Sequence, residues 1–142
     1  MGLFSKFLGA PKKAGDDAYL LFGMLLMCAA DGDFQEQEML TVQAFCSTLP
    51  EFRGKDLRGL LQQAGKQFRS HKSLDAAVQS LSAIESPAVR RKLFVLAADL
   101  ALSSGDVDEG EEQLLKGMQG VLGIDQVLAE KVFEVLALKY VQ

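Results

Sequence analysis

The sequence contains few of the residues that build zinc sites and disulfide scaffolds. It has one histidine, His71, and two cysteines, Cys28 and Cys46, in 142 residues, with no Cys-x-x-Cys pair. Because structural zinc is held by clusters of Cys and His, the usual zinc sites are excluded. Both cysteines lie among apolar residues at helical spacing, so we interpret them as small buried side chains in a reducing compartment. We expect His71 to lie on the surface.

Catalytic motifs are also missing. With one histidine, nucleophilic catalysis would require His71 to meet Cys28, Cys46 or a serine, and no spacing places them together. The sequence contains neither a phosphate-cradling glycine loop nor a dinucleotide-binding fingerprint. We therefore expect a binding or scaffolding protein that is not an enzyme.

The apolar runs are too short to cross a bilayer. The run AYLLFGMLLMCAA, residues 18–30, has 13 residues, whereas a spanning helix needs about 20. Asp16 and Asp17 stand directly before it, at the point where a secretory signal carries positive charge. A similar apolar stretch recurs at Leu93–Leu102, deep in the chain. We therefore predict two buried core helices in a cytoplasmic protein.

Basic residues do not dominate the chain, which carries a net charge of −4. Residues 1–52 hold three Lys/Arg and seven Asp/Glu, residues 53–92 hold nine and three, and residues 93–142 hold three and nine. This order argues against a nucleic-acid partner, whose binding face would be continuously basic. The basic middle has two interpretations, a solvated helix face and a patch for acidic lipid or protein. Its residues include Arg53, Lys55, Arg58, Lys66, Arg69 and Lys72.

The most informative pattern is a motif that recurs 73 residues further along the chain. The first copy reads LLMCAADGDFQEQEMLTVQAF and the second reads ADLALSSGDVDEGEEQLLKGM. In each copy an apolar helix ends at a glycine turn, and an acidic helix begins after it. Asp108 with Glu111 fits a capping box at the second helix start, and Asp33 with Glu36 can do the same at the first.

These patterns predict an all-α fold of about seven helices, in which two pseudo-symmetric helix-turn-helix repeats form one bundle. Apolar spacing of three and four extends through residues 57–81, Pro87 starts another helix, and Asp125 caps the last one. We divide the chain into a flexible N-terminal arm, residues 1–15, and a helical domain, residues 16–142. The arm is either docked or frayed, or it makes weak contact with a membrane surface. Its apolar side chains are Leu3, Phe4, Phe7 and Leu8.

The doubled turn resembles the mark of the TerB-like tellurite-resistance family, an Ala-(Ala/Ser)-Asp-Gly turn followed by an acidic helix start. The resemblance extends from about residue 18 to residue 138. It is carried by Ala29-Ala30-Asp31-Gly32 with Glu38, by Ser104-Gly105-Asp106 with Glu111 and Glu112, by Leu122-Gly123-Ile124, and by the opening Gly2-Leu3-Phe4-Ser5-Lys6-Phe7.

This resemblance implies an all-helical domain of phage, colicin and tellurite stress responses, without catalytic activity. It also implies divalent-cation binding through the turn acids, and action with other stress-response proteins at the cytoplasmic face of the inner membrane. Ser104 departs from the pattern, because the second copy expects Asp there, and the change removes one carboxylate ligand. Asp99, one turn before Ser103, is the residue that would compensate.

Two interpretations of the turn acids remain open. A hard cation, Ca²⁺ or Mg²⁺, binds several oxygen ligands, which clustered carboxylates on two neighbouring turns can supply. Acids at a helix start are also stabilised by capping and by the helix dipole, at about 0.5–2 kcal/mol each, without an ion. The spacing is not that of an EF-hand, whose loop needs Gly at its sixth position and Glu at its twelfth. The candidate ligands are Asp31, Asp33, Glu38, Asp106, Asp108 and Glu111.

Overall fold

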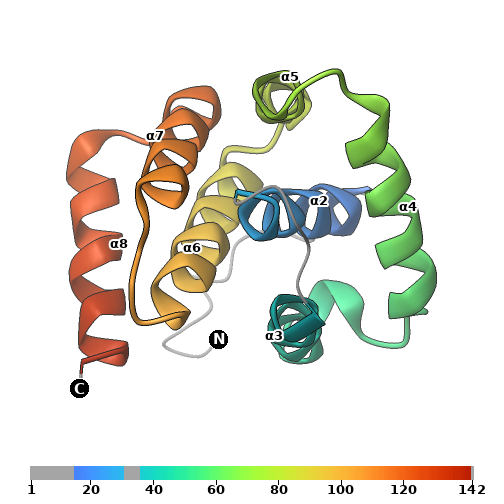
Figure 1. The fold of residues 1–142 in the computed structure, drawn as a ribbon, viewed down its shortest axis with the longest axis horizontal. Coiled ribbons are helices and arrows are strands. Elements are labelled where there is room, and N and C mark those ends of the chain that lie inside the picture. Colours follow the sequence, from blue (N-terminus) through green and yellow to red (C-terminus); the bar gives the residue numbers. More distant parts are fainter. Residues whose placement is uncertain (1–14, 31–35, 142) are drawn as a thin grey trace, which may run out of the picture.

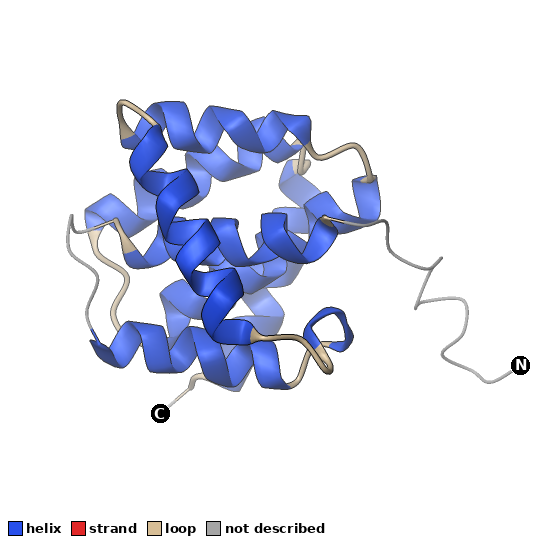
Figure 2. Ribbon diagram, turned by 90° about the vertical axis from the view of Figure 1, so that its right-hand side faces the viewer, coloured by secondary structure: helices blue, strands red, loops and turns tan. Residues whose placement is uncertain are grey.

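A computed structural model describes residues 15–30 and 36–141, and in the second range the side chains from residue 38 onward. These parts of the chain form seven α-helices and two short 3₁₀ helices, without a strand (Figure 2). The all-α class and the helix number expected from the sequence are therefore confirmed. The helices are α2 (Asp16–Cys28), α3 (Glu36–Ser47), η1 (Pro50–Phe52), α4 (Leu57–Ser70), α5 (Leu74–Gln79), η2 (Ser80–Ala83), α6 (Pro87–Ser103), α7 (Glu109–Leu122) and α8 (Gln126–Lys139).

The helix α2 lies at the centre of the bundle (Figure 1). It packs against α3, α4, α5, α6 and α7. Every residue from Leu20 to Cys28 is buried, because this helix is apolar around its whole circumference. The second apolar run, in α6, is also largely buried and packs most closely against α2. Both runs are therefore core helices, as the sequence predicts.

The crossing of α2 and α6 depends on a glycine. A Cβ atom added at Gly23 would lie 2.3 Å from Cδ1 of Leu93 and 2.9 Å from its Cγ. Leu93 itself is completely buried, so its side chain has no space into which to move. The absence of a side chain at Gly23 thus sets how closely the two core helices approach each other.

The other side of α6 carries α7 and α8, which Figure 1 shows on the side away from α4. Ser86 begins α6, its hydroxyl oxygen accepting a 3.3 Å hydrogen bond from the backbone N–H of Val89. At the end of α7, Gly123 adopts the left-handed conformation, with φ 70°. Asp125 then caps α8 through a 2.8 Å hydrogen bond from the N–H of Leu128. These helix boundaries agree with the sequence predictions.

Two ion pairs connect the basic middle of the chain to the rest of the bundle. Lys55 pairs with Asp17 at the start of α2. Lys92, on α6, pairs with Glu51, whose side chain is only 4% exposed. Because a buried carboxylate is costly without a partner, the two lysines are held by the fold and are not simply solvated.

The single histidine, which the sequence suggests lies on the surface, is partly exposed at the end of α4. The centroid of the His71 ring lies 5.8 Å from that of Phe22, which is fully buried in α2. His71 therefore also contacts the central helix. Cys28 and Cys46 are buried free thiols, in agreement with the sequence.

The N-terminal arm falls almost entirely outside the described residues, which begin at Gly15. The prediction of a separate segment 1–15 therefore stays a prediction. Within the part of the chain that the structure describes, no helix combines the length and the apolar character needed to cross a membrane.

Candidate metal centre at the helix starts

The start of α7 carries the capping box that the sequence predicts. Asp108 Oδ1 accepts a 2.7 Å hydrogen bond from the N–H of Glu111, and the N–H of Asp108 donates to Oε1 of Glu111 at 3.5 Å. Glu109, Glu111 and Glu112 all lie in the first turn, where the positive end of the helix dipole stabilises negative charge. The cap explains why acids are placed here even without an ion.

The start of α7 also lies against the end of α2. A Cβ atom added at Gly110 would lie 3.5 Å from the carbonyl oxygen of Ala30 and 3.4 Å from Oδ1 of Asp108. Ala30 is the last described residue before the first acidic turn. The second repeat therefore begins its acidic helix beside the place where the first repeat enters its own turn.

The thiol of Cys28 is influenced by one acid from α3 and one from α7. Burial, followed by the negative charges of Glu38 and Glu111, raises the pKa of the Cys28 thiol from 9.0 to about 12. Glu38 comes from α3 in the first repeat and Glu111 from α7 in the second. The charges of both carboxylates thus act on this one sulfur atom. One oxygen of Glu38, Oε2, is fully shielded from solvent.

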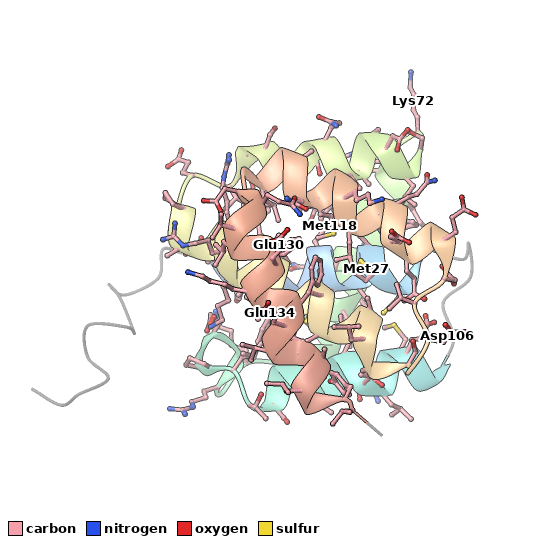
Figure 3. The ribbon with its side chains drawn as sticks, turned by 90° about the vertical axis from the view of Figure 1, so that its left-hand side faces the viewer. Met27, Lys72, Asp106, Met118, Glu130 and Glu134 are labelled. Atoms are coloured by element: carbon pink, nitrogen blue, oxygen red, sulfur yellow. The ribbon has the colours of Figure 1, made fainter. Side chains whose placement is uncertain are left out.

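The remaining predicted ligands are placed differently. Asp31 and Asp33 lie outside the described residues. Asp106 is exposed on the loop between α6 and α7 (Figure 3). Among the side chains that the structure describes, no group of three or more His, Cys, Asp or Glu residues is arranged to hold a metal ion. The structure therefore places Asp108 and Glu111 at the start of α7 and Glu38 in the first turn of α3, without arranging them as one ligand cluster, and it leaves Asp106 at the surface.

Ser104, which stands where the family pattern expects Asp, has a structural role in the turn. Its hydroxyl lies within hydrogen-bond distance of the carbonyl oxygens of Ala101, at 3.1 Å, and Asp106, at 2.9 Å. The next residue, Gly105, has a positive φ of 84°. Ser104 thus holds the end of α6 onto the turn through the backbone, which an ionised carboxylate, an acceptor only, could not do in this way.

Asp99 does not compensate for the missing carboxylate. Its side chain accepts hydrogen bonds from Lys139, at 2.9 Å, and from the hydroxyl of Tyr140. The ammonium group of Lys139 also lies 5.4 Å from the centre of the Phe45 ring on α3. Asp99 therefore anchors the end of α8 to α6, and the expectation that it serves the acidic turn is wrong.

The residue that sequence analysis missed at this site is Cys28. Its apolar neighbours indicate a core position, and the structure confirms that it is buried. The sequence offers one signal for its role, because Cys28 directly precedes Ala29 and Ala30 of the turn motif.

The described residues define an all-helical domain, in which the start of α7 lies against the end of α2. A family model described as tellurite resistance protein TerB matches residues 18–132. The chain belongs to the TerB family. Comparison with curated proteins gave no match, and comparison with solved structures gave none.

Proposed function

We propose that the protein is a non-enzymatic stress-response module of the tellurite-resistance type, which binds a divalent cation at the junction of its two acidic helix starts and recruits partner proteins. The observation that supports the proposal is that the charges of Glu38 on α3 and Glu111 on α7 both act on the buried thiol of Cys28. A single ion would then connect the two halves of the domain.

The chemistry of these donors suits a hard cation. Carboxylate oxygens are the ligands that Ca²⁺ and Mg²⁺ prefer, and two carboxylates brought close together repel each other unless a positive charge lies between them. Glu38 and Glu111 would hold the ion, with Asp108 beside them at the α7 cap. Asp31 and Asp33, on the adjoining turn in the sequence, would complete the ligand set. When bound, the ion supplies charge neutralisation and no reaction.

Thermal unfolding tests this proposal. The full chain is melted in EDTA and then in millimolar Ca²⁺, Mg²⁺ or Mn²⁺, as wild type and as Glu38→Gln. A ligand present at about one hundred times its Kd stabilises the folded state by about 2.7 kcal/mol, which raises the melting temperature by several degrees. We expect this rise in the wild type and its loss in the variant.

Glu112→Gln provides the matched control. Glu112 lies in the same first turn of α7, but its carboxylate is 60% exposed and pairs with Lys116 four residues along the helix. The melting temperature of Glu112→Gln should depend on the cation in the same way as that of the wild type. If Glu112→Gln and Glu38→Gln lose the response equally, the effect reflects general charge screening and the proposed site is wrong.

A metal-independent interaction domain is the second candidate, and the complete capping box at α7 favours it. The box satisfies the helix start with Asp108 and Glu111 alone. This candidate expects identical melting temperatures in EDTA and in every cation. In that case the acids are helix caps, and the acidic first turn of α7 is the surface to test for protein partners.

The proposal also includes where in the cell the protein acts. We place the protein in the cytoplasm, with weak contact between residues 1–15 and the inner membrane as a further element. The support is the apolar and lysine-containing sequence of the arm. Co-sedimentation with anionic vesicles, compared before and after removal of residues 1–15, measures this contact.

A further inference from the structure

The outer face of α8 is unusually apolar for a surface helix. Among the described residues, six large apolar side chains are at least 39% exposed, and four of them belong to α8 or directly follow it. The opposite face of the same helix packs into the core through Ala129, Leu136 and Phe133. Large apolar side chains that gather on one exposed helix are typical of a contact surface. The four exposed residues are Val127 (63%), Val135 (65%), Leu138 (74%) and Val141 (76%).

The spacing along this face is that of a helix-pairing seam. Within α8, Val127, Lys131, Glu134 and Leu138 follow one another at intervals of four, three and four residues. This alternation keeps one stripe facing a partner helix along its whole length. All four side chains are exposed. Figure 1 shows α8 at the edge of the molecule. In Figure 3, α8 faces the viewer, and Glu130 and Glu134 are labelled on it.

The charges at the middle of the seam indicate which partner it fits. Lys131 and Glu134 lie between the apolar ends. When the helix direction is reversed, the positive and the negative residue exchange places. If a second α8 packs antiparallel, Lys131 of each helix faces Glu134 of the other, and Val127 faces Leu138. A parallel pair would instead place Lys131 against Lys131, which is unfavourable. The stripe is therefore complementary to itself about a twofold axis, as an isologous dimer requires.

We propose that the outer face of α8 is a homodimer interface, in which two copies of the chain pair their α8 helices antiparallel. This inference goes beyond cation binding and does not depend on it. Two four-turn helices bury less area than the roughly 1,600 Å² of a standard interface, so the dimer is weak, with a dissociation constant in the micromolar range.

Charge reversal on the full-length chain tests the pairing. Sedimentation velocity is measured from low to high micromolar concentration, in EDTA and again in calcium, for the wild type, Lys131→Glu and Glu134→Lys. We expect a concentration-dependent dimer in the wild type. Each variant alone should dimerise at least about tenfold more weakly, because like charges then face each other twice. Lys116→Glu, on the exposed side of α7, should leave the dimer unchanged.

Mixing the two variants gives the decisive measurement. Lys131→Glu carries two acids at the centre of the seam and Glu134→Lys carries two bases, so the mixture should form a heterodimer with at least wild-type affinity. Circular dichroism of each variant confirms that the fold is retained.

Three results would overturn the proposal. One is a wild type that stays monomeric at every concentration; another is a dimer unaffected by either reversal; the third is no recovery on mixing. Binding of the monomeric chain to anionic vesicles, lost in Leu138→Asp, would assign the same face to a membrane instead.

Discussion

Gly23 is the residue whose replacement has the clearest structural consequence. In Gly23→Ala the new Cβ would overlap the side chain of Leu93, which is completely buried at the crossing of α2 and α6. Overpacking of this kind costs about 1–3 kcal/mol, which outweighs the gain of up to about 1 kcal/mol that Ala brings to a helix. We expect the free energy of unfolding in urea to fall by about 1–3 kcal/mol.

Gly120→Ala is the matched control for this substitution. Gly120 lies inside α7, is exposed, and has no atom within 4 Å of an added Cβ. There the helix propensity of alanine acts alone, and stability should rise by about 0.5–1 kcal/mol. Equal effects of the two substitutions would show that α2 and α6 do not meet at Gly23.

The buried thiols make stability depend on alkaline pH. The pKa of Cys28 rises from 9.0 to about 12 and that of Cys46 from 9.0 to about 11, in both cases mainly through burial. Above pH 9 the unfolded chain loses these protons while the folded chain keeps them. The free energy of unfolding is therefore undiminished below pH 9 and falls as the pH rises from 9 toward 12.

Two measurements check this behaviour. Urea unfolding between pH 7 and pH 10.5 should show the fall, and Cys46→Ala should reduce its slope. At pH 8 both thiols should react with a thiol reagent far more slowly than in urea, because the thiolate is the reactive form. Fast reaction of either native thiol at pH 8 would mean that the cysteine is not buried as described.

At the scale of single helices, the cap of α7 separates two sources of stability. Asp108→Ala removes the side-chain acceptor for the N–H of Glu111, and loss of such a cap costs about 1 kcal/mol. We expect this loss in EDTA, measured by urea unfolding. Asp108→Asn keeps an oxygen acceptor and should recover most of it.

The dependence of these variants on calcium then distinguishes capping from ligation. If Asp108 only caps the helix, the loss in Asp108→Ala is the same with and without calcium. If Asp108 also lies beside the ion, the stability loss in Asp108→Ala is larger in calcium than in EDTA. Asp108→Asn then restores stability in EDTA but not the additional stability that calcium gives. An Asp108→Ala chain as stable as the wild type in EDTA would contradict the capping role.

Helix boundaries could be predicted from the sequence because their causes are local. Pro87 at the start of α6, Asp108 with Glu111, and Asp125 after Gly123 each act within one turn, and all are found as expected. The same locality explains why the apolar run at residues 18–30 identified a core helix.

Contacts between helices could not be predicted in this way. Asp99 meets Lys139 and Tyr140 some forty residues later, and His71 lies against Phe22. The joint effect of Glu38 and Glu111 on the Cys28 thiol likewise depends on how α3 and α7 pack around α2. Repeat alignment indicates that the two turns are equivalent, but it does not give their distance in space.

At the scale of the whole molecule, the helices that contain the two copies of the sequence motif share one core. The central helix α2 of the first repeat contacts α5, α6 and α7 as well as its own neighbours α3 and α4. Leu93 and Ala97 of the second repeat are completely buried, and Leu93 is covered at Gly23 of α2. Neither repeat can therefore exclude water from its apolar side without the other.

This shared core predicts that the second half does not fold alone. A fragment of residues 72–142 would keep α5–α8 but expose the α2-facing side of α6, losing burial at about 25 cal/mol per Å² of apolar surface. A native domain is stable by only about 5–15 kcal/mol, so this loss is decisive. We expect the fragment to lack a cooperative thermal transition by circular dichroism, while the full chain melts in one step. A sigmoidal transition of the fragment at the melting temperature of the full chain would show instead that the repeats fold independently and that α2 is dispensable for the second.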